Sequence, residues 1–119
     1  MGVQNAEELR QLIVHGEGPT VEFKREFTTA IDREMVGLAN GGGGIVLVGV
    51  ADDSTIVGVD DPRLVADRVM GLCRTNVKPP ITPEIAAVEI DGRYVVVISV
   101  AEGEQKPYTA NDVCYVRAG

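Results

Sequence analysis

The sequence has no apolar run long enough to cross a membrane. The longest, from Ile45 to Ala51, has the length of a β-strand, whereas a membrane-spanning helix needs roughly 20 apolar residues. The first residues also lack the basic and then apolar layout of a secretory signal peptide. We therefore expect a cytoplasmic protein.

Histidine and cysteine are scarce, which disfavours several kinds of catalytic and metal site. His15 is the single histidine, so we expect no Ser-His-Asp or Cys-His triad, and a histidine-rich zinc site cannot form. It stands at the C-terminal end of a predicted helix, where it is expected to cap the helix or face solvent. Cys73 and Cys114 have no CxxC partner, and in a cytosolic chain we expect both to be reduced.

Basic residues are outnumbered by acidic ones. The chain has 11 Lys and Arg against 18 Asp and Glu, a net charge of −7, whereas neutralisation of phosphate by Lys and Arg supplies most non-specific affinity for nucleic acid. A nucleic-acid-binding protein of this composition must gather its basic residues on one face, carry them in another part of a longer protein, or hold a metal that neutralises phosphate. All three alternatives stay open at this point.

With 119 residues, 45% of them hydrophobic, the chain can build one core, and we expect a single domain over residues 1–119. The hydrophobic pattern predicts helices at 6–15, 29–40 and from Asp61-Pro62 to before Pro79. It predicts strands at 21–24, 45–50, 56–59, 84–90, 94–100 and 113–117. We expect 45–50 to be buried on both faces and Asp91-Gly92 to form a hairpin turn. The fold class is α+β, with a mixed sheet of about six strands and three helices.

Four consecutive glycines, Gly41 to Gly44, suggest a phosphate-binding loop, but their position argues against one. A P-loop or dinucleotide fingerprint runs from strand through glycines to helix, so that the helix N-terminus faces the phosphate. Here the predicted order is helix, glycines, strand, and no Gly-Lys-Ser/Thr follows. The pattern favours a helix C-terminus followed by close backbone packing.

Carboxylates are the plentiful reactive groups. The predicted strands place Glu22 and Asp52 on or beside neighbouring strands, and Glu17 precedes the first of them. Convergent carboxylate oxygens are what Mg²⁺ or Mn²⁺ requires, and such an ion can activate water at a phosphodiester. With 18 acidic residues in the chain, some trio of this kind is always found, and we expect most of these carboxylates to be solvated surface groups.

Several short motifs occur in an order that resembles the Schlafen AlbA_2 domain. They are Glu22-Phe-Lys24, Ala39-Asn-Gly-Gly-Gly-Gly44, the strand Ile45 to Val50 followed by Asp52-Asp53, Ile56-Val-Gly-Val59, Pro79-Pro-Ile81, Lys106-Pro107 and Tyr115-Val-Arg-Ala-Gly119. The resemblance runs from about Glu17 to Gly119. It implies an AlbA/Schlafen-like fold that forms the N-terminal part of a longer protein.

The resemblance implies a module that binds nucleic acid, DNA or RNA. Prokaryotic proteins of this family are described as transcriptional regulators, often with a winged-helix or ATPase-like region after this domain. Similarity to AlbA implies that basic residues contact backbone phosphate, with no cofactor required. The candidates are Lys24, Arg25, Lys106 and Arg117, with Arg74 and Lys78 as a second group. Lys24 and Arg25 flank glutamates, so they equally suit ordinary ion pairs.

A second function implied by the resemblance is enzymatic. Animal Schlafen proteins use two copies of the module as a metal-dependent endoribonuclease on structured RNA. Their three carboxylates correspond to Glu17, Glu22 and Asp52, which would be both the Mg²⁺ or Mn²⁺ ligands and the catalytic residues here, with Lys24 beside them. A single copy would have to form a homodimer to enclose RNA. ATP binding, from older descriptions of the family as a divergent ATPase, is the least favoured function.

Overall fold

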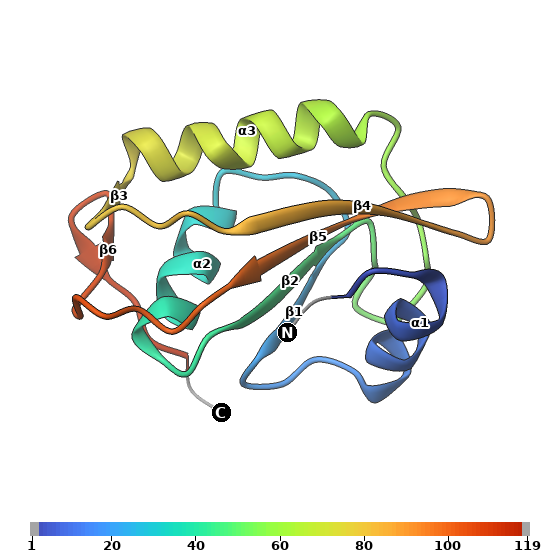
Figure 1. Ribbon diagram of the computed structural model, residues 1–119, viewed down its shortest axis with the longest axis horizontal. Helices are drawn as coiled ribbons and strands as arrows, with labels where there is room; N and C mark the ends of the chain where they lie inside the picture. Colours follow the sequence, from blue (N-terminus) through green and yellow to red (C-terminus); the bar gives the residue numbers. More distant parts are fainter. Residues whose placement is uncertain (1–2, 118–119) are drawn as a thin grey trace.

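The computed structural model describes residues 3–117 and consists of three helices and seven strands (Figure 1). The helices are α1 (Ala6–His15), α2 (Ile31–Asn40) and α3 (Pro62–Thr75). The strands are β1 (Val21–Lys24), β2 (Gly44–Val48), β3 (Val77–Lys78), β4 (Glu84–Ile90), β5 (Arg93–Val100), β6 (Thr109–Ala110) and β7 (Val113–Cys114). The predicted α+β class is confirmed. Between residues 3 and 117 there is no helix with the length and apolar character that crossing a membrane requires.

The strands form two sheets. The larger has the order β1-β2-β5-β4, and the smaller has the order β3-β6-β7. β1 and β2 run parallel, whereas β2 with β5 and β5 with β4 are antiparallel, so the larger sheet is mixed as predicted. The two-residue strands β3 and β6 escaped sequence analysis because such short pieces show no periodicity.

Three predicted boundaries need correction. Residues 56–59 do not form a strand; Ile56 and Val59 make isolated bridges to Val50 and Tyr94. Gly49 and Gly58 adopt φ of 109° and 77°, which bends the backbone out of the extended form that a ladder needs. The last strand ends at Cys114 instead of continuing to residue 117, and α2 begins at Ile31 because residues 28–30 form turns with i to i+3 hydrogen bonds.

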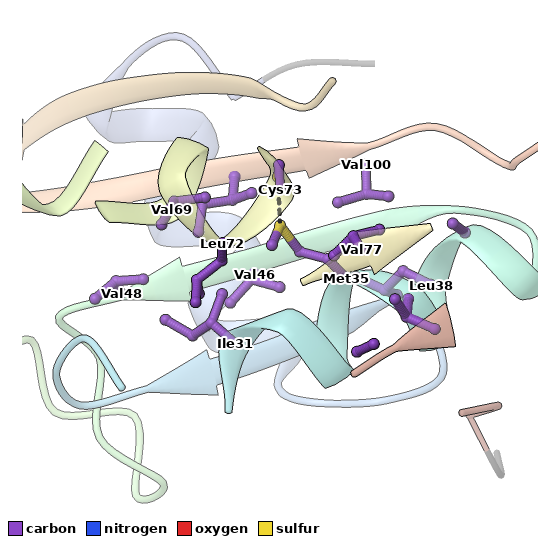
Figure 2. Close-up of a cluster of buried hydrophobic side chains, with 14 of the residues drawn as sticks. Ile31, Met35, Leu38, Val46, Val48, Val69, Leu72, Cys73, Val77 and Val100 are labelled. Atoms are coloured by element: carbon purple, nitrogen blue, oxygen red, sulfur yellow. Dashed lines mark hydrogen bonds between the residues drawn. The ribbon is translucent and has the colours of Figure 1, made fainter. Parts of the chain in front are cut away.

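Helix α1 lies on one face of the larger sheet, and helices α2 and α3 lie on the other (Figure 1). Val46 and Val48 pack with α2 and α3, whereas Ile45 and Leu47 pack with α1, since successive side chains of a strand alternate between faces. Every residue of β2 is buried, which confirms the prediction of a strand covered on both sides. Figure 2 shows the α2–α3 side of this core.

Both cysteines are free, as expected. Cys73 lies in the core with its Sγ 3.8 Å from the Met35 Sδ (Figure 2), and Cys114 is exposed. The hairpin prediction is also confirmed. Ile90 pairs with Arg93, and Asp91 and Gly92 adopt φ of 52° and 75°, the left-handed pair that a two-residue turn of the I′ type requires.

The glycine run packs against its own chain. Gly41 ends α2 by donating its N–H to the carbonyls of Gly37 and Leu38. At Gly43, where φ is 83°, a Cβ would lie 2.7 Å from the Val100 carbonyl oxygen, and at Gly44 a Cβ would collide with the Thr20 carbonyl oxygen. The run therefore allows close backbone approach after a helix C-terminus, as the order of elements predicted.

Candidate functional site

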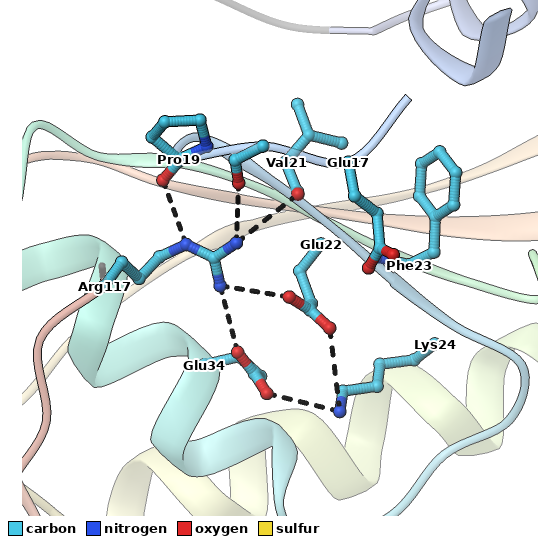
Figure 3. A network of polar contacts seen from close by, with 9 residues as sticks. Glu17, Pro19, Val21, Glu22, Phe23, Lys24, Glu34 and Arg117 are labelled. Atoms are coloured by element: carbon cyan, nitrogen blue, oxygen red, sulfur yellow. Dashed lines mark hydrogen bonds and ion pairs between the residues drawn. The ribbon is translucent and has the colours of Figure 1, made fainter. Parts of the chain in front are cut away.

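Four charged side chains meet between β1 and α2, and we call them the four-charge cluster: Glu22, Lys24, Glu34 and Arg117 (Figure 3). The alternation of side chains along β1 explains why Glu22 and Lys24 belong to this cluster. Val21 and Phe23 pack with α1 in the core, so Glu22 and Lys24 point to the other face, where Glu34 stands in the first turn of α2.

Each cation of the cluster bridges both carboxylates. The Arg117 Nη1 lies 3.1 Å from the Glu22 Oε1 and 3.0 Å from the Glu34 Oε1. The Lys24 Nζ lies 3.2 Å from the Glu34 Oε2 and 3.8 Å from the Glu22 Oε2. The side chains expose between 17% and 23% of their surface, so the charges are partly shielded from water and balance one another.

Arg117 has no guanidinium N–H left for another partner. Its Nε donates to the Pro19 carbonyl at 2.9 Å, and its Nη2 donates to the carbonyls of Gly18 at 2.7 Å and Val21 at 3.4 Å. With the two carboxylate bonds of Nη1, this accounts for the five donors that a guanidinium carries. In this arrangement Arg117 links the C-terminal segment to β1, to the turn before it and to α2.

Glu22 is the carboxyl whose protonation the cluster alters. Burial raises the pKa of Glu22 above its usual value, and the neighbouring Glu34 and Glu17 raise it further. The hydrogen bond from Arg117 and the charge of Lys24 act in the opposite direction without cancelling the rise. The pKa shift follows from desolvation and like-charge repulsion, which both disfavour the charged form of a carboxyl.

The three carboxylates proposed as metal ligands have separate roles in the structure. Glu17 is exposed, and its Oε2 accepts the Phe23 backbone N–H at 2.9 Å on the outer edge of β1. Glu22 is held by Arg117 and Lys24. Asp52 is exposed in the turn after β2 and lines a separate cavity with Arg25 and Asp53.

The donor set therefore does not fit a divalent cation in this arrangement. Among residues 3–117, no three His, Cys, Asp or Glu side chains are grouped so that they can hold a metal ion. A cation site needs oxygen atoms converging at about 2.0–2.6 Å from one point. Here the cations of Lys24 and Arg117 already occupy the oxygens of Glu22.

The four basic residues proposed for phosphate contact do not share one surface. Lys24 and Arg117 belong to the four-charge cluster, and Arg25 is exposed immediately after β1. Lys106 lies in the loop after β5 and pairs with Glu102 at 2.7 Å. Lys24 pairs in register with Val48 at one end of β2, whereas Val100, which leads to the Lys106 loop, pairs with Gly44 at the other.

A different group of basic residues lies along α3 and β3. Between residues 62 and 78 the chain has four basic residues and one acidic residue, Asp67. We call three of them the α3 basic surface: Arg63, Arg74 and Lys78. All are exposed, and none forms an ion pair within residues 3–117. Arg74 and Lys78 were candidates from the sequence but Arg63 was not, although Arg63 and Arg74 stand about three helical turns apart and so share a face.

The family model described as Schlafen, AlbA_2 matches residues 17–119. The chain belongs to this family. The solution structure of the N-terminal domain of a RecG-related protein from Nitrosomonas europaea, whose name relates it to ATP-dependent DNA helicases, superposes on this AlbA_2 chain with a TM-score of 0.70 at 19% identity. The alignment covers 98% of this chain and 90% of that domain.

A crystal structure of the DIP2311 protein from Corynebacterium diphtheriae has the same fold, with a TM-score of 0.69 at 19% identity. The alignment covers 96% of this AlbA_2 chain but 25% of that protein, so the chain corresponds to about a quarter of its length. A search among curated proteins finds no match. At this level of identity the two structures show the fold alone.

Proposed function

We propose that this AlbA_2 domain is a nucleic-acid-binding module that contacts backbone phosphate through the α3 basic surface. The observation that carries the proposal is the segregation of charge. The chain has a net charge of −7, yet residues 62–78 hold four exposed basic side chains and one acid. A local patch of one sign can attract a phosphate backbone even where the net charge of the protein repels it.

Two further observations support this proposal. Family membership and the name of the Nitrosomonas neighbour both point toward proteins that work with nucleic acid. The opposite face of the sheet suits such contact less, because α1 carries Glu7 and Glu8 and its Arg10 is paired with Asp91. As part of a longer protein, the domain would serve a transcriptional regulator and would need no cofactor for binding.

The test is the salt dependence of binding to fluorescent DNA and RNA probes, single-stranded and duplex, measured by anisotropy. Each phosphate contact contributes about 0.9 to the slope of log affinity against log salt on B-form DNA. We expect Arg63→Ala, Arg74→Ala and Lys78→Ala each to weaken binding to every probe and to reduce this slope. Arg10→Ala is the matched control, since it removes the same charge from the other face of the sheet.

Two results would overturn the proposal. One is binding that does not change with salt, because phosphate contact requires counterion release. The other is an equal loss of affinity in Arg10→Ala and in the α3 variants, because the proposal assigns the contact to one face only.

A metal-dependent endoribonuclease is the second candidate, and one observation favours it. Glu17 accepts the Phe23 backbone N–H of β1, and its charge raises the pKa of the neighbouring Glu22. A divalent cation would have to displace Lys24 and Arg117 from Glu22. Cleavage of structured RNA in the presence of Mn²⁺ that Glu22→Gln abolishes, with the fold intact, would support this function and would justify a search for a homodimer. Cleavage that survives Glu22→Gln together with Asp52→Asn would remove it.

A further inference from the structure

We infer that a cavity beside the first turns of α3 binds one unpaired nucleotide of a single-stranded nucleic acid. The cavity has a volume of about 500 Å³ and lies between the segment after β1, the segment that follows Gly58, and α3. We call it the α3 cavity. This inference rests on the proposed function and deepens it, because it names the form of nucleic acid that the module selects.

The α3 cavity has an apolar wall at the protein surface. Phe27 and Val59 line it while they pack against the core on their other side. Leu64, in the first turn of α3, also lines it and exposes 43% of its surface, which few large apolar side chains within residues 3–117 do. Phosphate gains nothing from such a wall, whereas a nucleobase has an apolar face to cover it.

Two arginines complete the cavity without being neutralised by ion pairs. Arg25 and Arg68 line it, and neither forms a salt bridge within residues 3–117. The Arg68 guanidinium carbon lies 5.9 Å from the centroid of the Phe27 ring, a cation–π distance. A guanidinium whose charge no carboxylate neutralises can take a base against its plane, and Arg25 remains for the adjoining phosphate.

Carboxylates on the same cavity restrict the ligand further. Glu26 and Asp60 line it and are exposed, while Asp61 accepts the Leu64 N–H at 3.0 Å as the cap of α3. Ionised carboxylates are acceptors only, so they favour a base that carries an amino group and disfavour a second phosphate. A duplex buries its base faces in the stack, so an unpaired base with an amino group, such as adenine or cytosine, fits this combination better than duplex DNA or thymine, which has no amino group.

The structure offers a matched pair of variants to test this. The Arg33 guanidinium carbon lies 5.8 Å from the Tyr115 ring centroid and makes the same kind of cation–π contact, but Arg33 is outside the α3 cavity. Arg68→Ala and Arg33→Ala therefore remove equal charge and one arginine–aromatic cation–π contact each, from exposed positions. Circular dichroism melting of both variants checks that each remains folded.

The probes are a fluorescein-labelled 12-nucleotide strand of alternating cytosine and adenine, a 12-nucleotide oligothymidine and a 12-base-pair duplex. We expect the cytosine–adenine strand to bind best, and Arg68→Ala to weaken its binding about tenfold, as loss of one stacked base does. Arg33→Ala should weaken it much less. Equal losses in the two variants, or no preference among the three probes, would overturn the inference.

A titration with adenosine monophosphate, followed by amide chemical shifts, separates this inference from the proposed function. Shifts confined to the segments that line the α3 cavity, lost in Arg68→Ala, would support the site even if no oligonucleotide binds. If all probes bind equally with a steep salt dependence and the nucleotide shifts nothing, the inference fails and the proposed function stands. If neither probes nor nucleotide bind, both fail.

Discussion

The Nη1 of Arg117 lies 3.0 Å from the Oε1 of Glu34, although 83 residues separate them along the chain. Through the same guanidinium, the C-terminal segment also contacts Glu22 and the turn before β1. β1 is an edge strand, and exposed strand edges are sites of unwanted pairing. Arg117 covers part of this edge through the Val21 carbonyl, and Glu17 covers more of it through the Phe23 N–H.

Replacing Arg117 should destabilise the domain. Arg117→Ala leaves the half-buried carboxylates of Glu22 and Glu34 with Lys24 as their remaining partner and removes bonds to three carbonyls. We expect a loss of about 2–4 kcal/mol in the free energy of unfolding, measured by urea denaturation. Lys106→Ala, which breaks an exposed pair with Glu102, is the control and should cost far less, because exposed ion pairs contribute little to stability. Similar losses in both variants would contradict a structural role for Arg117.

The stability of the domain should depend on the protonation of Glu22. Its pKa is raised by burial and by the charge of Glu34, so between the ordinary value of 4.5 and the raised value the folded state binds more protons than the unfolded state. The contribution of Glu22 is therefore greatest below pH 4.5 and falls as the pH rises through the raised pKa. As the pH rises through that interval, the free energy of unfolding of the native protein should fall relative to that of Glu22→Gln. Urea denaturation of both proteins at a series of pH values across that interval measures this difference. If the two stabilities change in parallel with pH, the prediction is refuted.

A charge in the centre of the sheet should unfold the protein. Val48 is completely buried on the α2–α3 side, and an unpaired carboxylate there costs several kcal/mol, comparable to the whole stability of a small domain. We expect Val48→Asp to lose its cooperative thermal transition. Val14→Asp introduces the same group where 81% of the side chain is exposed, and it should fold normally. A folded Val48→Asp protein would show that the assignment of the core is wrong.

The glycine run should tolerate alanine at one position and not at another. At Gly44 a Cβ would collide with the Thr20 carbonyl oxygen and lie 2.7 Å from the Leu38 Cδ2, whereas at Gly42 nothing stands within 4 Å. We expect Gly44→Ala to lower the free energy of unfolding by about 1–3 kcal/mol, as overpacking does. Gly42→Ala should be nearly neutral. If Gly42→Ala is the more harmful, the run serves something other than close packing.

The elements that sequence predicted well are those whose signals are local. Alternation over Val21 to Lys24, the apolar run of β2 and the Asp91-Gly92 turn each lie within a few residues, and each reflects a backbone preference or the burial of one face. The structure places these elements with the predicted bounds or within two residues of them. The β3 and β6 strands were missed because they form by pairing with segments distant in sequence or too short to show a pattern, β3 with β6 and β6 with β7.

The site was decided by tertiary structure. The sequence by itself determined that Glu22 and Lys24 share one face of a strand, because the alternation of β1 requires it. It contained no signal that Glu34 from α2 and Arg117 from the end of the chain would meet them, and Arg117 and Lys24 stood equally well as phosphate ligands. Two tertiary features place the guanidinium between the two carboxylates: α2 packs against the sheet, and the C-terminal segment returns past Gly37. There, a Cβ added to Gly37 would lie 3.0 Å from the Arg117 Cγ. Once partly removed from water, those carboxylates need a cation, and the chain supplies its own.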